Sequence, residues 1–528
     1  MGYNLNWNGL TPNIVNNSPL LTQRPSTTMS DKNGNLLFFG DNTRIHDASG
    51  NVMQNGHLHV PWADAGVQTV LSIPAPCDPD KYYYIITRYG ELQYSIIDMT
   101  LNNGLGGVVQ GQKNIVLAGV PIFGIAPGPP NFHRVVATMV TATKHANNRD
   151  YWVMIHKVPG DQWEAYLLTS AGFNPTPVIS KIGSPLFRFT YLTGPGQIKF
   201  SHDGNYLAFA NSAMYYDSSS FNAPPPSHIL PRCTQYNELD CPLQIKNELF
   251  RFNKQTGELY DYVHLEMDSS FFSWANTVIG WIGGIGYNRT AEFSPNNNIV
   301  YFGNNVGIIQ YDISSGDSLL MATTWHLLSH QRNSTSLFPI TEGGSEQLSL
   351  APDGKIYSAW HNLGVVNNPN TFGSGANFVF NLNLNFSQYT DLGFGFTNFP
   401  ASVFYPRHIK TQPREVCNQD SIQISLNDTN FLDSVTFLFH GGSQITYIPR
   451  ELPFDTVITA HGAYPVQLIT YSGCEFDTIF DTLRVHPQPN AHLGPDTLLC
   501  EGDTFAMNLQ DTTFSYLWNT GDTTPGIE

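Results

Sequence analysis

The stretch SDKNGNLLFFG at residues 30–40 joins a polar turn to a short apolar run. Asp, Asn and Gly supply the positive φ angles of a tight hairpin, and the apolar and aromatic residues that follow are typical of a buried strand. The same pattern returns in CDPDKYYYIIT (77–87), NNRDYWVMIH (147–156), SHDGNYLAFA (201–210), SPNNNIVYFG (294–303) and APDGKIYSAW (351–360). Six copies at irregular spacings predict a radially repeated sheet, a β-propeller with loop insertions.

The pattern extends into further hairpins. A second strand–turn–strand pattern follows in FRFNKQTGELYDY (250–262) and IIQYDISSGDSLL (308–320), as expected for the outer strands of the same unit. We expect another blade from FVFNLNLNF (378–386) and SVFYPRHIK (402–410), completed by the N-terminal strand near residues 3–7, because ring closure removes the last free strand edge. The predicted propeller spans residues 1–412 and has about seven blades, within a range of six to eight.

The sequence pattern changes after the propeller. Residues 413–487 hold short alternating strands and one cysteine pair, which predict a small β-sandwich. Residues 488–528 open a further unit of the same kind and stop after about forty residues, too few to finish a sandwich. We therefore expect either that the native chain continues past Glu528 or that a neighbouring copy supplies the missing strands.

The composition favours an all-β protein of several domains. The 528 residues are 13% aromatic and 13% charged, with 45 Gly and 35 Pro, whereas helical proteins usually expose many Lys, Glu, Ala and Leu residues. The net charge of −17 and the lack of a Lys/Arg cluster argue against nucleic-acid binding. No apolar run reaches the ~20 residues of a membrane-spanning helix, so no membrane span is expected.

The cysteines bear on the compartment. The start, MGYNLNWNGL, does not read as a signal peptide, so the protein is either cytosolic or has lost a signal before residue 1. Cys233 and Cys241 lie eight residues apart in a Pro-rich loop, and Cys417 and Cys474 bracket one small-domain-sized segment. We predict that each pair forms a disulfide in an oxidising compartment, the alternative being four buried free thiols. Cys77 and Cys500 are then left over.

No catalytic motif stands out in the sequence, and no catalytic residue is predicted. A propeller enzyme would place carboxylates and histidines around its channel, and the candidates are Asp203, Asp353, Glu346, His202 and His361. Asp203 and Asp353 lie within the repeated turns, where Asp is favoured for its side-chain-to-backbone hydrogen bond. A glycosidase needs two converging carboxylates, which a sequence alone does not reveal.

Metal and cofactor sites are not predicted either. HLH at residues 57–59 puts His57 and His59 on one face of a strand, and His326 and His330 form a wider pair, but neither pair has a third ligand in view. The DPD turn at residues 78–80 could hold a structural Ca²⁺, although an EF-hand pattern is missing. Surface histidines and an ordinary turn are the favoured interpretations.

Six longer stretches of the sequence are distinctive: SDKNGNLLFFGDNTRIHDASGNVMQNG (30–56), SIPAPCDPDKYYYIIT (72–87), FSPNNNIVY (293–301), LAPDGKIY (350–357), LGPDTLLCEG (493–502) and YLWNTGDTTPGI (516–527). In these stretches the sequence resembles the large secreted proteins that gliding and other Bacteroidetes export by the type IX secretion route. The resemblance implies an N-terminal propeller-like region followed by PKD-like or Ig-like modules, a Sec signal before residue 1 and a sorting domain beyond residue 528.

The resemblance also implies O-glycosylation at Asp-Ser/Thr triplets, and the equally weighted alternative is that Asp-Thr merely begins strands. These triplets start at Asp317, Asp420, Asp433, Asp455, Asp477, Asp481, Asp496, Asp511 and Asp522.

These observations favour a non-enzymatic extracellular surface protein, either an adhesin or a subunit of a cell-surface appendage or filament. Low charge, many aromatic and Asn side chains and long polar loops suit broad contacts with protein or glycan ligands, and a homo-oligomer or larger surface assembly is expected. The alternatives are a secreted glycan- or peptide-directed hydrolase with its site in the propeller channel, and a passive spacer.

Overall fold

The computed structural model is almost entirely β, as the composition predicts. It divides into two compact units: the first is Met1–Pro406 with Asn430–Asp433 and Tyr471–Phe476, and the second is Arg407–Thr429, Ser434–Thr470 and Asp477–Glu528. The structure describes residues 2–8, 11–18, 25–58, 68–88, 90–119, 135–158, 160–186, 196–211, 246–265, 290–303, 307–329, 347–359, 363–379, 396–400, 407, 409–412, 416–439, 444–488, 491–509 and 514–528.

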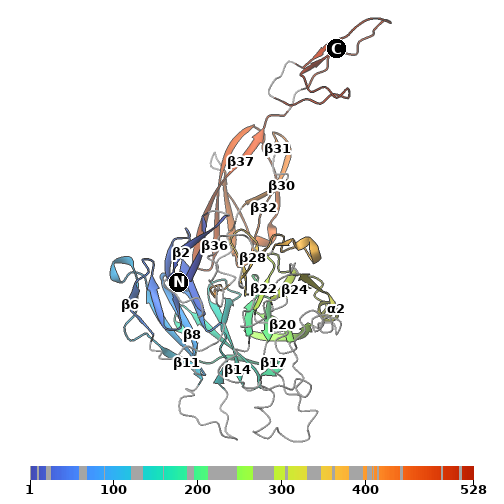
Figure 1. The fold of residues 1–528 in the computed structure, drawn as a ribbon. Coiled ribbons are helices and arrows are strands. Elements are labelled where there is room, and N and C mark those ends of the chain that lie inside the picture. The colour runs from blue at the N-terminus through green and yellow to red at the C-terminus, as the bar shows by residue number, and fades with distance from the viewer. Residues whose placement is uncertain are drawn as a thin grey trace. The chain divides into compact units, whose positions relative to one another are not determined.

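The first unit begins with a two-stranded hairpin and a nine-stranded sheet (Figure 1). The hairpin consists of β1 (Gly2–Asn8) and β2 (Thr11–Ser18). The sheet contains two successive strand groups, β3 (Ser26–Ser30), β4 (Leu36–Asp41), β5 (Arg44–Asp47) and β6 (Val52–His57), then β7 (Val70–Ala75), β8 (Asp78–Arg88), β9 (Glu91–Asp98), β10 (Gly107–Val108) and β11 (Ile115–Gly119). A parallel contact between β10 and β6 joins the two groups.

Four more antiparallel strand groups follow along the chain. The third contains β12 (Val135–Val136), β13 (Thr141–Lys144), β14 (Tyr151–Val158), β15 (Gly160–Thr169), β16 (Gly172–Phe173) and β17 (Val178–Leu186). The fourth contains β18 (Gly196–Phe200), β19 (Tyr206–Asn211), β20 (Lys246–Asn253) and β21 (Glu258–Leu265). The fifth contains β22 (Thr290–Phe293), β23 (Ile299–Gly303), β24 (Gly307–Asp312) and β25 (Trp325–Ser329), with the one-turn helix α2 (Ser318–Thr323) before β25. The sixth contains β26 (Gln347–Leu350), β27 (Ile356–Ala359), β28 (Leu363–Val366) and β29 (Phe378–Val379).

Each repeated polar turn leads into a buried strand, as predicted: β4, β8, β14, β19, β23 and β27 all begin within these stretches or directly after their turns. The turn residues work as expected of Asp in a hairpin. Asp31 Oδ1 accepts hydrogen bonds from Asn33 N (2.9 Å) and Asn35 N (2.8 Å), and Asp203 Oδ1 accepts one from Asn205 N (3.1 Å). The apolar residues that follow can then enter the sheet at a fixed register.

Successive strand groups pack face to face through shared hydrophobic clusters. The third and fourth groups meet around Trp163, whose ring centroid lies 5.6 Å from that of Phe209 and 5.3 Å from that of Phe250. Comparable clusters join the first group to the second, the second to the third, the fourth to the fifth and the fifth to the sixth. This consecutive packing of strand groups is the arrangement of a β-propeller.

The segments assigned to a seventh blade are only partly described. Phe378–Val379 completes the sixth group as β29, and Ile409 and Lys410 belong to a strand of the second unit. Those four residues therefore do not belong to a separate blade. The rest of 378–386 and residues 402–406 and 408 lie outside the described residues, so the blade count stays a prediction.

The second unit begins at Arg407, slightly before the predicted boundary at residue 412. One sheet contains β30 (Ile409–Gln412), β32 (Ser421–Leu426) and β35 (Phe454–Val457), and the other contains β31 (Val416–Cys417), β37 (Glu475–His486), β36 (Gly462–Ser472), β33 (Ser434–Phe439) and β34 (Gln444–Tyr447). The rings of Phe437 on β33 and Phe454 on β35 lie 5.1 Å apart, so the two sheets pack as a sandwich.

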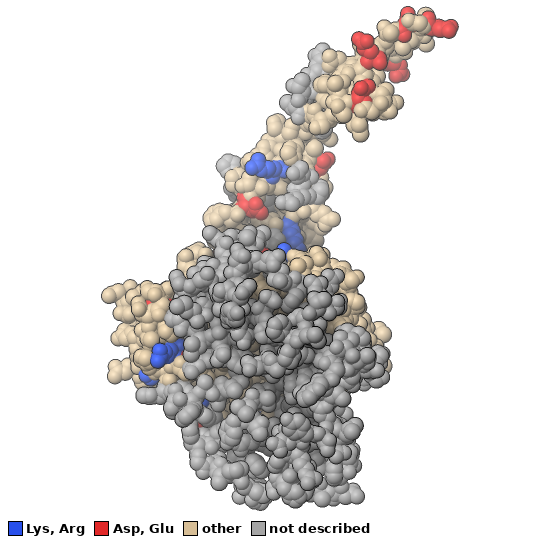
Figure 2. All heavy atoms as spheres, viewed as in Figure 1, with Lys and Arg blue, Asp and Glu red and all other residues tan. Residues whose placement is uncertain are grey.

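The C-terminal segment has little internal packing among its described residues. Its short strands β38 (Met507–Asn508) and β39 (Gly526–Ile527) pair with each other, while Leu498 and Leu517 are 97% and 82% exposed. Residues 488–528 contain no Lys or Arg, and Figure 2 shows acidic side chains spread over this segment. In the described part of the whole chain, no helix combines the length and apolar character needed to cross a membrane.

Candidate functional site

In the first unit, edge strands of successive groups lie beside one another: β3 beside β7, β13 beside β18, β18 beside β22, and β22 beside β26. We call these edge strands the inner strands. Buried polar side chains join these strands. Gln197 Oε1 accepts hydrogen bonds from Thr290 Oγ1 (2.7 Å) and Ala291 N (2.9 Å), and Thr290 Oγ1 accepts one from Leu348 N (3.0 Å). The inner strands are thus connected from side chain to backbone across three groups.

Asn398 is a second centre of these contacts and lies close to the inner strands of several groups. Its Nδ2 donates to the carbonyl oxygens of Val70 (2.8 Å) and Val140 (3.1 Å), and its backbone N donates to Ser26 O (2.7 Å). Gln68 Nε2 bridges from Asn398 Oδ1 (3.2 Å) to Ile198 O (2.7 Å). Asn398 therefore satisfies buried backbone groups from the first, second and third groups, and Gln68 extends the network to the fourth.

A buried ion pair joins two inner strands, between Lys199 on β18 and Glu292 on β22. Lys199 Nζ lies 3.2 Å from Glu292 Oε2, and the side chains are 6% and 1% exposed. Glu292 also accepts hydrogen bonds from Phe293 N (2.9 Å) and Leu350 N (3.1 Å). His202 Nε2 lies 3.9 Å from Glu292 Oε1 and 3.3 Å from Phe293 O. This carboxylate is paired and hydrogen-bonded within the fold, as a buried charge must be.

This ion pair could have been predicted from the sequence by aligning the repeats, because its two residues precede the repeated turns at equivalent positions. Lys199 and Glu292 occupy the same position of the repeat, two residues before the serine that opens the turns of 201–210 and 294–303. Ser349 is the corresponding residue of the next copy. Opposite charges at equivalent positions of neighbouring repeats predict a contact between blades, because the inner strands are adjacent.

The other predicted acidic candidates do not join this cluster through any described bond. Asp203 Oδ1 accepts from Ser201 Oγ (2.6 Å), and Asp353 accepts from Lys355 N (3.1 Å) and from the hydroxyl of Tyr357 (2.8 Å). Each carboxylate therefore stabilises its own turn. Glu346 and His361 lie outside the described residues.

The possible metal ligands named from the sequence are only partly among the described residues. His57 is exposed at the end of β6, and the ring of His326 lies 6.0 Å from that of Phe372, whereas His59 and His330 fall outside the described residues. Asp78 Oδ2 bonds Lys81 Nζ at 2.7 Å, so the DPD turn is held by a lysine. Within the described ranges, no group of three or more His, Cys, Asp or Glu side chains could hold a metal ion.

The cysteine pairing differs from the prediction. Cys474 forms a disulfide with Cys77, with the Cα atoms 5.2 Å apart, while Cys417 and Cys500 are unpaired. Cys417 pairs in the sheet with His486, at the far end of the 12-residue strand β37 that begins directly after Cys474. At about 3.3 Å per strand residue, this places the two cysteines ~40 Å apart, far beyond bonding reach. Cys233 and Cys241 lie outside the described residues.

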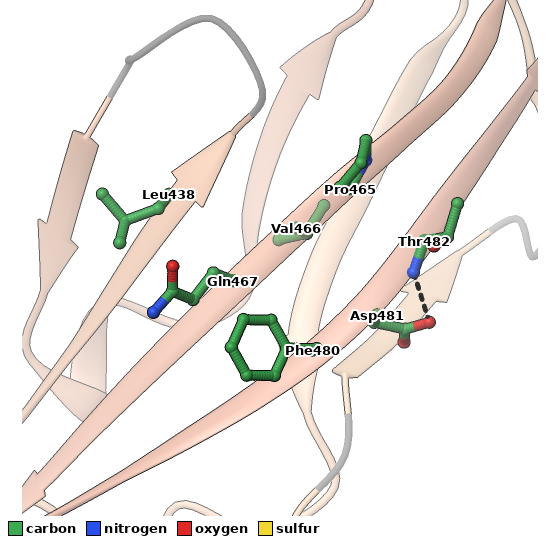
Figure 3. A pocket seen from close by; sticks show the side chains of 7 residues that line it. All are labelled: Leu438, Pro465, Val466, Gln467, Phe480, Asp481 and Thr482. Atoms are coloured by element: carbon green, nitrogen blue, oxygen red, sulfur yellow. Dashed lines mark hydrogen bonds between the residues drawn. The ribbon is translucent and has the colours of Figure 1, made fainter.

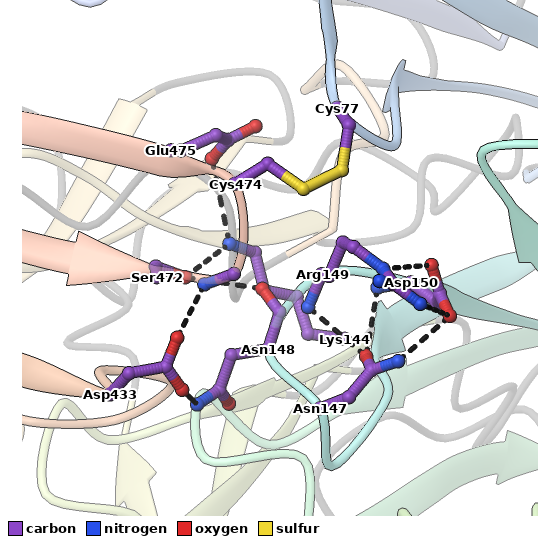
Figure 4. Close-up of a disulfide and its surroundings, with 11 residues drawn as sticks. Cys77, Lys144, Asn147, Asn148, Arg149, Asp150, Asp433, Ser472, Cys474 and Glu475 are labelled. Atoms are coloured by element: carbon purple, nitrogen blue, oxygen red, sulfur yellow. Dashed lines mark hydrogen bonds and ion pairs between the residues drawn. A yellow bond between two sulfur atoms is a disulfide. The ribbon is translucent and has the colours of Figure 1, made fainter.

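Figure 4 shows the surroundings of the disulfide, all within the first unit. The loop at Cys474 is held by Lys144, whose Nζ donates to Ser472 Oγ (2.9 Å) and lies 3.7 Å from Glu475 Oε2. Asp433 Oδ2 accepts from Gly473 N (2.6 Å), and Asp433 Oδ1 accepts from Asn148 Nδ2 (2.6 Å). The two segments Asn430–Asp433 and Tyr471–Phe476 are therefore bonded to the turn between β13 and β14.

Phe431, in the first of these segments, contacts Lys254. Its ring lies 4.9 Å from Lys254 Nζ, which also donates to Asp203 O (2.6 Å). Burial lowers the pKa of Lys254, while the charge of Asp203 partly offsets this effect. Of these contact residues, the sequence marks only Asp203, as a channel candidate, and Asp433, as the start of a possible glycosylation triplet. Isolated polar residues in loops carry no sequence signal of their partners.

The second unit carries a shallow hollow of about 400 Å³ on its five-stranded sheet. Figure 3 shows its lining residues, which come from three adjacent strands: Leu438, Pro465, Val466, Gln467, Phe480, Asp481 and Thr482. Phe480 is 76% exposed, whereas Val466 is buried. The hollow is open and mainly apolar, and it brings together no set of catalytic side chains.

No protein-family model and no curated protein matches this sequence. Among solved structures, the extracellular domain of the putative hybrid two-component system BT4673 from Bacteroides thetaiotaomicron is 10% identical with a TM-score of 0.29, covering 88% of this chain and 50% of that one. PorZ, a surface component of the type IX secretion system of Porphyromonas gingivalis, is 9% identical with a TM-score of 0.31, covering 81% and 52%.

The Dos1 propeller is 9% identical with a TM-score of 0.33, covering 75% of this chain and 78% of that one. Enzymes, among them a gluconolactonase, also occur among the similar structures. The chain spans about half the length of the first two structures. The consecutive packing of its own strand groups, and not these similarities, makes the first unit a β-propeller-like array within an all-β chain.

Proposed function

We propose that this protein is a non-enzymatic extracellular surface protein, an adhesin or a subunit of a cell-surface appendage, exported by the type IX route. Its ligands would be proteins or glycans on other surfaces, and its assembly a homo-oligomer or a larger surface structure. One observation carries the proposal, the disulfide between Cys77 and Cys474. Both cysteines lie in exposed turns. An exposed disulfide persists in an oxidising compartment and is readily lost in a reducing one.

The described polar groups near the inner strands support binding over catalysis. A general acid or base must be free to exchange its proton with a substrate. Glu292 is instead ion-paired with Lys199 and accepts two backbone hydrogen bonds, and Asp203 and Asp353 are bonded within turns. These carboxylates are engaged in holding the fold.

Surface location is tested on intact cells of the organism that produces the protein. A membrane-impermeant biotin reagent should label the full chain before lysis, and loss of a type IX translocon component should abolish the labelling. Labelling only after lysis would overturn the proposal, and labelling that survives loss of the translocon would overturn the export route.

The choice between adhesin and hydrolase is tested with Glu292→Gln in the full chain, restored to cells that lack the protein. Attachment to a protein- or glycan-coated surface should fall in the deletion strain and return with the variant. A melting curve of purified variant checks that it is folded. Loss of attachment together with loss of a hydrolytic activity in a folded variant would favour the hydrolase.

A further inference from the structure

The disulfide joins two turns that are remote in sequence. Cys77 follows β7 and adopts a φ of 61°, and Cys474 lies in the turn between β36 and β37. The sequence separation is 397 residues. The closed loop therefore includes the strand groups from β8 to β29, which is most of the propeller-like array.

The turn that carries Cys474 is shaped for a close approach to Arg149. Gly473 has a φ of +61°, and a Cβ atom there would lie 2.7 Å from Arg149 Cβ and 2.8 Å from Arg149 Cα. Only glycine tolerates both the backbone conformation and the close contact. Lys144 and Asp433 then bond the residues on either side of Cys474. The noncovalent contacts hold the turn in place, and the disulfide makes the attachment covalent.

We propose that the Cys77–Cys474 disulfide is a tension clamp. A pull on the chain beyond residue 474 passes through the two sulfur atoms to Cys77 and leaves residues 78–473 unloaded. Without the disulfide, the same pull would act on the hydrogen bonds of Lys144 and Asp433 and then on the strands behind them. Covalent bonds resist forces that break hydrogen bonds one after another. The clamp matters only in a protein that bears a mechanical load at the cell surface, so its biological role rests on the function proposed above.

Single-molecule pulling tests the clamp directly. The full 528-residue chain is held by handles at its two ends and stretched in an optical trap, first oxidised and then in a reducing agent. The oxidised chain should release only residues outside the disulfide loop. Reduction should release the chain enclosed between two cysteines that are 397 positions apart, which corresponds to an extra contour length of about 1,400 Å at ~3.6 Å per residue.

Two variants serve as controls for this measurement. Cys77→Ser/Cys474→Ser should give the long extension without reducing agent, and Cys417→Ser, which removes an unpaired thiol, should behave like the wild type. An oxidised wild-type chain that gives the long extension would overturn the proposal. An oxidised Cys417→Ser variant that gives the long extension would also overturn it, because Cys417 would then be the bonded partner.

The outcome is independent of the test of surface location. The pulling experiment could give the short extension while the biotin reagent fails to label the protein on cells. The disulfide would then still act as a mechanical clamp, but its role at the cell surface would be overturned. Free thiols at Cys77 and Cys474 in protein labelled on cells would overturn the clamp and leave the surface location in place.

Discussion

At the residue scale, small polar side chains determine where this chain can turn and what its turns can contact. Asp47 Oδ1 accepts from Ser49 N (2.9 Å) and Asn51 N (3.1 Å), which repeats the pattern of Asp31. The Asn297 side chain goes further, since its Oδ1 accepts from His202 N (2.8 Å) on the neighbouring strand group. The repeated turns therefore close hairpins and also link blades, and only the first role can be read from the sequence.

His156 illustrates a buried group whose charge state affects folding. Its ring is fully buried and lies 4.5 Å from the ring of Trp163, and burial lowers its pKa to about 3. Between roughly pH 6.5 and pH 3 the unfolded chain therefore binds a proton that the native chain does not. Stability should fall as the pH falls through this window, by up to about 1.4 kcal/mol per pH unit.

Urea unfolding of the wild type at pH 7, 6, 5 and 4 measures this dependence. His156→Gln should reduce this pH dependence by up to the contribution of one bound proton. Equal pH dependence in the wild type and His156→Gln would contradict the assignment of His156 as a neutral buried group.

Gly473 is the residue on which the approach to Arg149 depends. Gly473→Ala adds a Cβ that would lie 2.8 Å from Arg149 Cα, so the turn must move away from Lys144 and Asn148. We expect a loss of about 1–3 kcal/mol and a lower yield of the Cys77–Cys474 disulfide. Non-reducing peptide mapping and melting curves measure the two effects. Gly494→Ala is the matched control, because Gly494 has a φ of +85° and nothing within 4 Å, and an equal disulfide loss there would refute the steric argument.

At the element scale, the sequence predicts well where strands occur but predicts poorly which strands pair with each other. The turn-plus-apolar stretches fall on β4, β8, β14, β19, β23 and β27, because local turn chemistry and strand propensity act within about ten residues. The sequence places Phe378–Val379 in a separate blade, whereas the two residues pair with Val366 and Val365 on β28. A short apolar run fits any sheet edge, and only three-dimensional pairing decides which one.

Asn398 shows how a single loop residue can hold several elements together. Its amide supplies hydrogen bonds to Val70 O and Val140 O and accepts one from Gln68. Asn398→Asp keeps the shape but removes both donors and adds a buried negative charge. We expect a loss of about 3–5 kcal/mol in the unfolding free energy of the first unit.

Denaturant unfolding followed by tryptophan fluorescence measures this loss, since Trp152 and Trp163 lie in the first unit. Asn51→Ala, at an exposed turn position, is the control and should change stability by less than about 0.5 kcal/mol. A change in Asn398→Asp no larger than that of the control would mean that the inner strands are held by other contacts.

At the scale of the whole molecule, the disulfide framework is the feature that the sequence predicted incorrectly. Spacing suggested Cys417 as the partner of Cys474 because the two bracket a domain, yet they lie at opposite ends of β37. The true partner is 397 residues away and became available only through the fold of the first unit. The spacing of the cysteines likewise does not predict that Lys144 and Asp433 position the turn.

The thiol content of the intact chain checks this framework. Alkylation of denatured, unreduced protein should modify Cys417 and Cys500 and leave Cys77 and Cys474 unmodified until a reductant is added. The same peptide map tests the predicted Cys233–Cys241 disulfide. Recovery of a peptide that joins Cys417 to Cys474 would contradict the structure.

The size of the closed loop leads to a last prediction about unfolding. A cross-link between residues 397 positions apart restricts the unfolded chain much more than the folded one. Cys77→Ser/Cys474→Ser should therefore unfold at lower denaturant concentration, with a loss of about 2–5 kcal/mol, because its unfolded chain gains conformational freedom. Its unfolding should also depend more steeply on denaturant, because an unrestricted unfolded chain exposes more surface. Cys417→Ser should match the oxidised wild type in both respects. If the double variant instead keeps the wild-type midpoint and slope, the cross-link does not restrict the unfolded chain, and the stability of the first unit comes from its packed sheets alone.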